Sequence, residues 1–435
     1  MIFPNPTRGL LAVVAFTIAG TGLAADTAAP EALTLSDAEA IALRNHPQVA
    51  IAQLQALVAQ QSVKENQAAF YPSIFGDFDA VAAGNRDTRI LAGSLNNPVI
   101  YDRVADGLGA SELITDFGMT KNLVASARLT AKARTQNLAA VNLQILLNVE
   151  VNYFNTLQAQ AVLLVAQATT KARQLLVDRV TALARNKLRS ELDVSFAQVA
   201  LQQSKLLLQK AAGDADGAQA SLAGALGYRD RRHFALEDRA PAVREIPDVG
   251  PLIDAALQNR PDLLRLRYEQ DAATDLARAQ KDQNYPTVAA VGAIGNALSH
   301  DYRLPDKYAA GGIEVSIPIF AGGAYLARQR AAELKAQIAG QTVRDQEDNV
   351  SRDVQLAWLN FNTAKQRLLT TEELLQNADQ SHELAQARYK LGSSSIVELT
   401  DAEVNATSAQ IAEANARYDA LIQQAILDFQ TGTLR

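Results

Sequence analysis

Two very long stretches without a helix breaker constrain this chain more than any other feature. The first runs from Gly118 to Gly213 and the second from Gly340 to Gly432, with one interruption at Gly392. Glycine and proline are the residues that most often end a helix. About 65 to 70 helical residues before a turn near 187–190 would span roughly 100 Å. No compact globular domain accommodates such a rod, so each stretch predicts a long helical hairpin.

The second hairpin has a readable seam between its two helices. Large and small residues alternate at heptad spacing, which lets antiparallel helices pack closely as a left-handed coiled coil. On the ascending helix the predicted seam is Val354, Ala357, Phe361, Ala364, Leu368, Thr371, Leu375, Ala378, His382, Ala385 and Tyr389. On the descending helix it is Val397, Thr400, Val404, Thr407, Ile411 and Ala414.

The N-terminus predicts that the protein is exported from the cytoplasm. Arg8, an apolar run from Leu10 to Ala19 and small residues ending at Ala24 are typical of a secretory signal peptide, residues 1–24. The alternative is a membrane anchor, which the short apolar run and the missing basic flank disfavour. No later run of about 18 apolar residues predicts a transmembrane helix.

Composition excludes several kinds of chemistry. The chain has no Cys, which excludes disulfides, thiolate metal sites and a lipidated Cys. A net charge of −6 with interspersed signs disfavours nucleic acid as a partner. The four histidines have no metal-ligand spacing, and His382 has a simpler role as a seam residue. No nucleophile or nucleotide motif is present, so we expect neither an enzyme nor a cofactor.

The chain repeats its own plan. The repeated residues of the first half are Ala42, Leu43, Asn45, Pro47, Ala59, Tyr71 and Pro72, and they recur at a constant offset as Ala256, Leu257, Asn259, Pro261, Ala273, Tyr285 and Pro286. In the first copy, Ser36 and Glu39 have the spacing of a capping box that opens a helix. The predicted units are repeat one at 25–228, with strands at about 72–115 and a hairpin at about 119–226; a connector at 229–250; and repeat two at 251–435, with strands at about 286–319 and a hairpin at about 324–432.

Alternating segments follow each Tyr-Pro pair. In 73–83 the residues Ile74, Phe78, Ala80 and Ala82 fall on one face, and Asp77 and Asp79 fall on the other with Phe75 and Val81. The second copy has the corresponding segment at 287–297, and a second strand follows each segment after a loop. Strands of about ten residues flanked by aromatics fit a transmembrane barrel, although a soluble antiparallel sheet has the same alternation. Four strands cannot stay open in a bilayer, so we expect a barrel shared between chains of a cyclic oligomer. The predicted fold is thus mainly α with a small β part.

The chain resembles the outer membrane efflux protein family, the TolC-like exit ducts, over nearly its whole mature length. The residues that carry the resemblance are the twofold repeat, the Asn-x-Pro segments, the Tyr-Pro strand entries, the strand exits at Thr115–Gly118 and Phe320–Gly323, and Tyr389–Gly392 followed by Glu398, Asp401 and the long helix to Gly432. The resemblance implies a homotrimer in the outer membrane with a shared β-barrel and a periplasmic α-barrel. It further implies a periplasmic adaptor (membrane fusion protein) and an inner-membrane transporter of the RND or ABC type as partners.

By this resemblance Tyr389, Glu398, Asp401 and Asp193 would form the pore constriction. Crowded carboxylates make a cation-binding ring, and Tyr389 would hydrogen-bond to the neighbouring hairpin and hold the constriction shut. Ordinary capping of the descending helix is the alternative for Glu398 and Asp401.

The hairpin ends would dock the adaptor through exposed side chains. The predicted docking residues are Lys187, Leu188, Leu391, Gly392 and Ser393, and the alternative for Gly392 is local C-capping alone.

Two departures from the family pattern affect these tips. The first tip reads Lys187-Leu188-Arg189-Ser190 without a Gly, and it is predicted to be two residues shorter than the second. Ser394 stands where some family members have an Arg, which predicts a weaker lock.

The sequence thus predicts a trimeric, passive duct of a tripartite efflux pump or type I secretion system. The alternative is a periplasmic coiled-coil adaptor, which would normally have one hairpin instead of two. A secreted enzyme on a helical scaffold has no motif in its favour.

Overall fold

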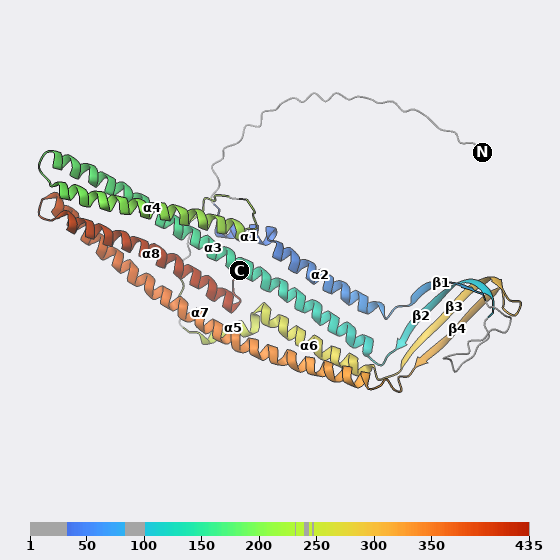
Figure 1. The fold of residues 1–435 in the computed structure, drawn as a ribbon. Helices are drawn as coiled ribbons and strands as arrows, with labels where there is room; N and C mark the ends of the chain where they lie inside the picture. The colour runs from blue at the N-terminus through green and yellow to red at the C-terminus, as the bar shows by residue number, and fades with distance from the viewer. Residues whose placement is uncertain (1–32, 83–100, 231, 239–242, 246–247, 435) are drawn as a thin grey trace, which may run out of the picture.

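A computed structural model describes residues 33–82, 101–230, 232–238, 243–245 and 248–434. The predicted signal peptide lies outside these residues. Figure 1 shows an elongated molecule with a small sheet at one end and helical hairpins at the other. The elements in chain order are α1 (Leu35–Asn45), α2 (Pro47–Ala68), β1 (Ser73–Val81), β2 (Arg103–Thr115), α3 (Met119–Arg185), α4 (Glu191–Ala225), α5 (Gly250–Asn259), α6 (Pro261–Asp282), β3 (Thr287–His300), β4 (Lys307–Ser316), α7 (Ala324–Lys390) and α8 (Ile396–Thr431).

The helices form a single curved layer rather than a compact bundle. Near the tips, α3 packs against α4 and α8, and α8 packs against α7, which gives the order α4–α3–α8–α7. Near the sheet, α2 and α6 flank α3, and α7 packs on α6, which gives the order α2–α3–α6–α7. The 67-residue helices α3 and α7 therefore run through both halves of the layer.

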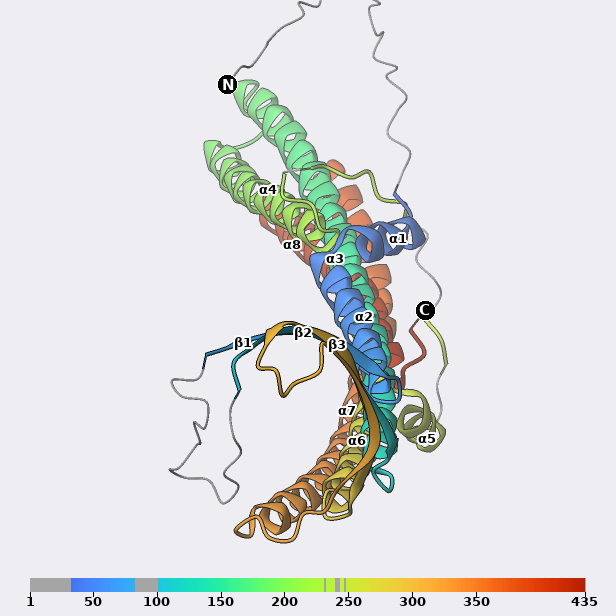
Figure 2. The same ribbon diagram turned by 90° about the vertical axis from the view of Figure 1, so that its right-hand side faces the viewer.

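The four strands form one antiparallel sheet in the order β1–β2–β3–β4. Figure 2 shows that this sheet is curved. Among the described strands β1 pairs only with β2, and β4 pairs only with β3. The two outer strands thus leave backbone hydrogen-bonding groups open.

Glycines allow close backbone approach where the two repeats end. Gly227 has φ +83°, and a Cβ there would lie 3.1 Å from the Asn45 carbonyl oxygen of the first Asn-x-Pro turn. Gly432 has φ +74°, and a Cβ there would lie 3.5 Å from the Arg260 Cα of the second turn. Both repeats therefore pack the end of their last long helix on their own Asn-x-Pro turn.

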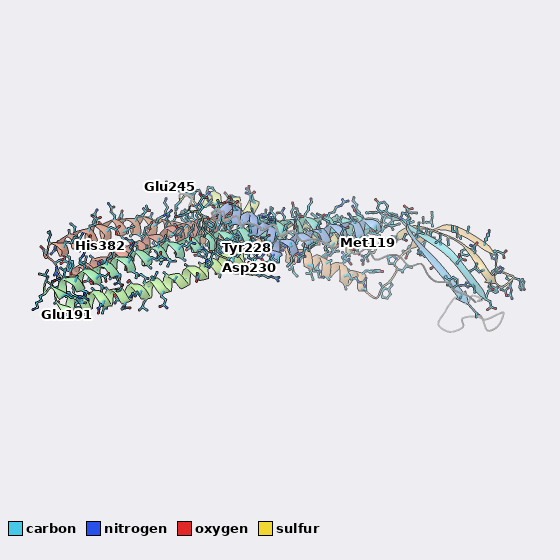
Figure 3. All side chains as sticks on the ribbon, turned by 90° about the horizontal axis from the view of Figure 1, so that it is seen from above. Met119, Glu191, Tyr228, Asp230, Glu245 and His382 are labelled. Atoms are coloured by element: carbon cyan, nitrogen blue, oxygen red, sulfur yellow. The ribbon has the colours of Figure 1, made fainter. Side chains whose placement is uncertain are left out.

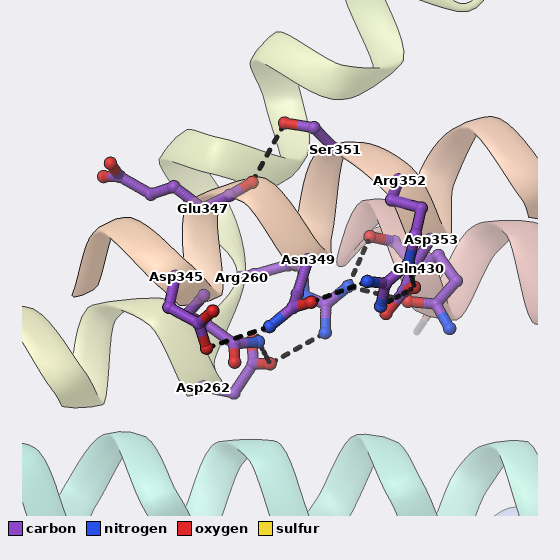
Figure 4. Close-up of polar contacts among 10 residues, drawn as sticks. Arg260, Asp262, Asp345, Glu347, Asn349, Ser351, Arg352, Asp353 and Gln430 are labelled. Carbon is purple, nitrogen blue, oxygen red and sulfur yellow. Dashed lines mark hydrogen bonds and ion pairs between the residues drawn. The ribbon is translucent and has the colours of Figure 1, made fainter. Parts of the chain in front are cut away.

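Arg260 ties the second turn to the C-terminal helix (Figure 4). Its guanidinium is buried and donates to Gln430 Oε1 at 2.7 Å and to Asp262 Oδ2 at 2.7 Å. Asp262 also accepts from Gln346 of α7 at 3.2 Å. Buried charges are favourable only when they are paired in this way.

The largest buried cluster lies midway along the molecule, where α1, α3, α4 and α8 meet. It includes Val149, Phe154 and Leu222, which are almost fully buried. The Tyr153 hydroxyl donates to the backbone oxygens of Leu33 and Glu237, at 2.9 and 2.8 Å. This tyrosine fixes the short parallel bridge between Leu33 and Leu236 to the helical layer.

The structure corrects the predicted start of the first helix. The N-cap of α1 is Thr34, whose hydroxyl accepts from the Asp37 N–H at 3.1 Å, so the capping box predicted from Ser36 and Glu39 is wrong. Glu39 instead shares a hydrogen bond with Glu150 of α3.

The predicted seam of the second hairpin is right on the ascending helix and only partly right on the descending one. All predicted positions of the ascending helix are buried or half-buried, including Phe361 and Tyr389. On α8, however, Val397 and Val404 are 44% and 40% exposed. Ala414 is buried as predicted, and Thr400, Thr407 and Ile411 are half-buried. The fully buried positions near the tip are Ile396, Leu399, Ala402, Ala406 and Ala409. The face is rotated because α8 packs against α3 as well as α7.

Within the described residues, no helix combines the length and the apolar character needed to cross a membrane.

We predict that Glu150 makes stability depend on pH. Burial and the nearby Glu39 carboxylate raise the pKa of Glu150 to about 8. The folded protein therefore keeps a proton that the unfolded chain releases above pH of about 4.5, and stability should fall as the pH rises from about 4.5 to about 8. Glu150→Gln keeps the hydrogen-bonding group and removes the ionisation.

Thermal unfolding at pH values of about 5, 7 and 9 measures this effect. The variant should unfold at a higher temperature than the wild type at the highest pH, and the difference should shrink at the lowest. Equal pH slopes for the two proteins would contradict the assignment. Glu65→Gln on the exposed surface of α2 is the matched control.

Candidate functional site

The two hairpin tips, residues 186–190 and 391–395, fold alike. Lys187 has φ +59° and Gly392 has φ +74°, and both donate their backbone N–H to the carbonyl three residues earlier. Ser190 and Ser395 then cap α4 and α8. The first tip was expected to be two residues shorter, which is wrong, because two residues lie between the left-handed residue and the serine cap at each tip. Lys187 adopts the left-handed conformation at the position where the second tip has glycine.

The predicted carboxylates have different partners. Asp193 forms a reciprocal capping box with Ser190, at 3.1 and 3.2 Å, so its side chain serves the start of α4. Glu398 pairs with Arg388 of α7 at 2.9 Å. Asp401 is exposed and lies with this pair along an open groove of about 600 Å³ on the second hairpin.

Tyr389 lies between the two hairpins. Its side chain is only 5% exposed and belongs to a buried cluster with Leu176 and Val180 of α3, Val194 of α4, and Ile396 and Leu399 of α8. Burial raises the pKa of its phenol. The hydroxyl has no hydrogen-bond partner among the described residues, so the hydrogen bond expected to a neighbouring hairpin stays a prediction.

Arg189 of the first tip is a site residue that the sequence analysis missed. Its guanidinium stacks on the Tyr389 ring at 4.5 Å, and Nη2 donates to the Tyr389 carbonyl oxygen at 3.4 Å. By the correspondence of the two tips, Arg189 occupies the position of Ser394. The internal repeat was therefore the signal that could have found it, since the arginine missing from one tip is present in the other.

The predicted docking residues are exposed at the end of the molecule. Leu188 is 69% and Leu391 is 81% exposed, and Lys187, Gly392 and Ser393 are also exposed. Large apolar side chains at a solvent-exposed turn provide a contact surface for another protein. The Gly392 N–H also caps α7, so the capping alternative and the docking role are compatible.

The outer helices of the layer expose apolar side chains along their free sides. On α4 these are Leu192, Phe196, Val199 and Leu206; on α7 they are Leu356, Leu359, Leu369, Leu374 and Leu384; on α2 they are Ile51, Leu54, Leu57 and Val58. A groove of about 720 Å³ next to α2 is lined mainly by apolar atoms. Such extended apolar strips are typical of surfaces that are covered by another protein chain.

Comparisons with known proteins agree with this architecture. The family model for outer membrane efflux protein matches residues 40–228 and 252–433. Outer membrane protein TolC of Escherichia coli (strain K12) is 24% identical over 355 residues, covering 76% of this chain and 72% of that protein. The cation efflux system protein CusC of the same strain is 24% identical over 376 residues, covering 83% and 78%.

Solved structures match over most of the chain. A crystal structure of CusC has a TM-score of 0.77 at 20% identity and covers 92% of each chain. The Campylobacter jejuni CmeC outer membrane channel has a TM-score of 0.75 at 17% identity and covers 92% of this chain and 85% of that one. These likenesses confirm the predicted fold.

We predict that Arg189→Ala loosens the contact between the two tips. The substitution removes the cation over the Tyr389 ring, a contact worth about 0.5 to 2 kcal/mol, and leaves α3 and α4 intact. Hydrogen–deuterium exchange should become faster in the last turns of α7 and the first turns of α8.

Arg185→Ala, an exposed residue of the last turn of α3, is the control. Unchanged exchange in Arg189→Ala would show that the apolar cluster alone joins the tips.

Proposed function

Because this chain belongs to the outer membrane efflux protein family, whose members are outer membrane channels and not enzymes, we propose that it assembles as a homotrimeric, passive exit duct of a tripartite export system. The chain is an outer membrane protein. This location argues against the alternative of a soluble periplasmic adaptor.

The open edges carry the proposal of a ring. The sheet and the helical layer each end in two different free sides. These are β1 and β4 in the sheet, α2 and α7 in the helices near the sheet, and α4 and α7 in the helices near the tips. A twofold dimer would pair β4 with β4 and leave both β1 edges open. A head-to-tail ring pairs β4 of one copy with β1 of the next and covers every edge.

The same arrangement supports a duct. Three copies, the number that the family resemblance implies, would place twelve strands in one closed barrel in contact with outer membrane lipid. The helical layers would then form a cylinder that extends into the periplasm, with α4 of one copy beside α7 of the next. Their exposed leucines would be buried at that contact, where each large apolar side chain contributes about 1.5 to 3 kcal/mol.

The tips would lie at the periplasmic end and form the gate. Glu398 and Asp401 would each occur three times around the axis, with Arg388 beside each Glu398. This arginine offsets part of the repulsion between the carboxylates, so Asp401 carries more of the unbalanced charge. Asp193 is directed to its helix cap and contributes less to the ring than the sequence analysis expected.

The exposed tips fit a periplasmic adaptor. Adaptor docking at Leu188 and Leu391 would move the hairpins apart and connect the duct to an inner-membrane transporter of the RND or ABC type. Export through an efflux pump and through a type I secretion system both use such a passive duct, with substrate choice made by the transporter.

We predict a cation-blocked conductance that depends on the gate carboxylates. In planar bilayers, a multivalent cation added on the side of the tips should reduce the current, and added salt should weaken the block. Glu398→Ala combined with Asp401→Ala should abolish the block. Asp353→Ala, far from the tips, is the control.

Native mass spectrometry of the same preparation checks the assembly. A mass of three copies supports the homotrimer, and a monomer that nevertheless conducts would contradict the ring. Unchanged block in the double variant would place these carboxylates away from the pore.

We predict that Leu188→Glu and Leu391→Glu weaken adaptor binding. A carboxylate at an apolar contact must lose its water without gaining a partner, which opposes docking. Site-specific cross-linking between the tips and the adaptor should fall, while trimer formation and conductance in bilayers stay at wild-type values. Leu206→Glu on α4 lies away from the tips, at the proposed contact between copies. It should impair trimer formation, so it separates an effect on assembly from an effect on docking. Undiminished cross-linking in both tip variants would rule out their docking role.

A further inference from the structure

A buried charged cluster joins the two hairpins beyond the tips. It consists of Arg173 on α3, Glu403 on α8 and His382 on α7. Figure 3 labels His382, which lies toward the tip end of the molecule. Arg173 is 5% exposed, and its Nη1 donates to the Ala200 carbonyl oxygen of α4 at 2.7 Å. All four long helices at this level therefore contribute to the cluster.

The contacts of Glu403 in this cluster are longer than hydrogen bonds. Arg173 Nε lies 3.9 Å from Glu403 Oε2, and His382 Nε2 lies 4.0 Å from Glu403 Oε1. Arg173 Nε, Glu403 Oε2 and His382 Nε2 are buried and have no hydrogen-bond partner within the described part of the chain. Apolar side chains of similar size would hold two hairpins together better than charges paired at this distance. The cluster is thus a weak point in the contact between the hairpins.

The charges are divided unequally between the hairpins. The first hairpin contributes only the Arg173 guanidinium, which stays protonated in proteins. The second contributes the Glu403 carboxylate and the His382 imidazole. With Glu403 ionised and His382 neutral, the second hairpin presents a charge of −1 to Arg173. Protonation of either group makes that charge zero, and protonation of both makes it +1.

We propose that Arg173, Glu403 and His382 form an acid-released latch between the two hairpins, which holds α3 against α8 at neutral pH and repels them apart when the periplasm becomes acidic. The direction of the response does not depend on which group takes up the first proton, because each protonation lowers the attraction toward Arg173. The inference rests on the proposed duct, in which separation of the hairpins opens the gate.

The surroundings of the cluster support the assignment. The titratable groups that interact electrostatically with Glu403 are Arg173 and His382. The titratable group that interacts with Arg173 is Glu403. From α4 the neighbour is the uncharged Ala200 carbonyl. Burial raises the pKa of Glu403, so it takes up a proton at a higher pH than an exposed carboxylate does. The Thr169 and Thr407 hydroxyls on the same two helices lie 3.4 Å apart, a further polar contact that water can replace.

Double electron–electron resonance between spin labels on α3 and α8 tests the latch directly. The chain has no Cys, so Lys171→Cys and Asn405→Cys, both exposed, supply the only labelled thiols. Labelled chains diluted with unlabelled ones report the distance within one chain of the full-length assembly. We expect a longer and broader distance distribution at a pH of about 5 than at a pH of about 7.5, a range in which His and buried carboxylates titrate.

Four variants separate the latch from general acid effects. Arg173→Met should lose the shift, because the positive charge that is attracted to Glu403 has been removed. Arg173→Lys should retain it. His382→Gln should retain the shift, because Glu403 still loses its charge on protonation while Arg173 keeps its own. Arg173→Met combined with Glu403→Leu, which replaces the pair by apolar side chains, should keep the short distance at both pH values.

A wild-type distance that does not change with pH would overturn the latch, as would an Arg173→Met variant that shifts like the wild type. Single-channel recording of the same preparation keeps the two proposals apart. A conducting trimer without the distance shift removes only the latch. A distance shift in a protein that does not conduct removes the duct and leaves the latch.

Discussion

An unpaired strand edge is the constraint on which the rest of this molecule depends. Backbone groups that cannot reach water must be hydrogen-bonded, and each unsatisfied group costs several kcal/mol in hydrocarbon. The sheet here is complete except at β1 and β4, and the helical layers repeat the same incompleteness at α2, α4 and α7. In the proposed ring, one chain is a segment of a wall, and the repeated placement of free edges makes head-to-tail closure the simplest way to complete that wall.

The internal duplication explains both the regularity of the wall and where it departs from regularity. Each repeat ends a long helix against its own Asn-x-Pro turn, through Gly227 in one case and Gly432 in the other. At the tips the copies have diverged in a complementary way. Arg189 occupies the position of Ser394, and it stacks on Tyr389 of the opposite hairpin. The contact between the two tips is therefore not symmetric, because only the first hairpin supplies the arginine.

The hairpins meet through contacts of two different strengths. The cluster around Tyr389 consists of apolar side chains around one phenol hydroxyl, whereas the Arg173, Glu403 and His382 cluster consists of charged and polar groups whose buried atoms lack hydrogen bonds. Midway along the molecule, the Arg244 and Asp428 pair and the Glu39 and Glu150 pair hold the connector and α1 to the layer. In the proposed duct, stronger contacts midway along the molecule and weaker contacts between the hairpins near the tips would suit opening at the tips.

The sequence by itself determined the elements that depend on local chemistry. The helix breakers located both hairpins, the Tyr-Pro pairs located the strand entries, and the heptad pattern identified the buried face of α7, because these signals need only neighbouring residues or one partner helix. The resemblance to known ducts then identified the family. Tertiary structure alone decided what depends on a second neighbour. The buried face of α8 near the tip is rotated because that helix also packs on α3. Glu39 bonds to Glu150 instead of capping the first helix. Tertiary structure also brought Arg189 onto Tyr389, two residues 200 positions apart in sequence that no local pattern connects.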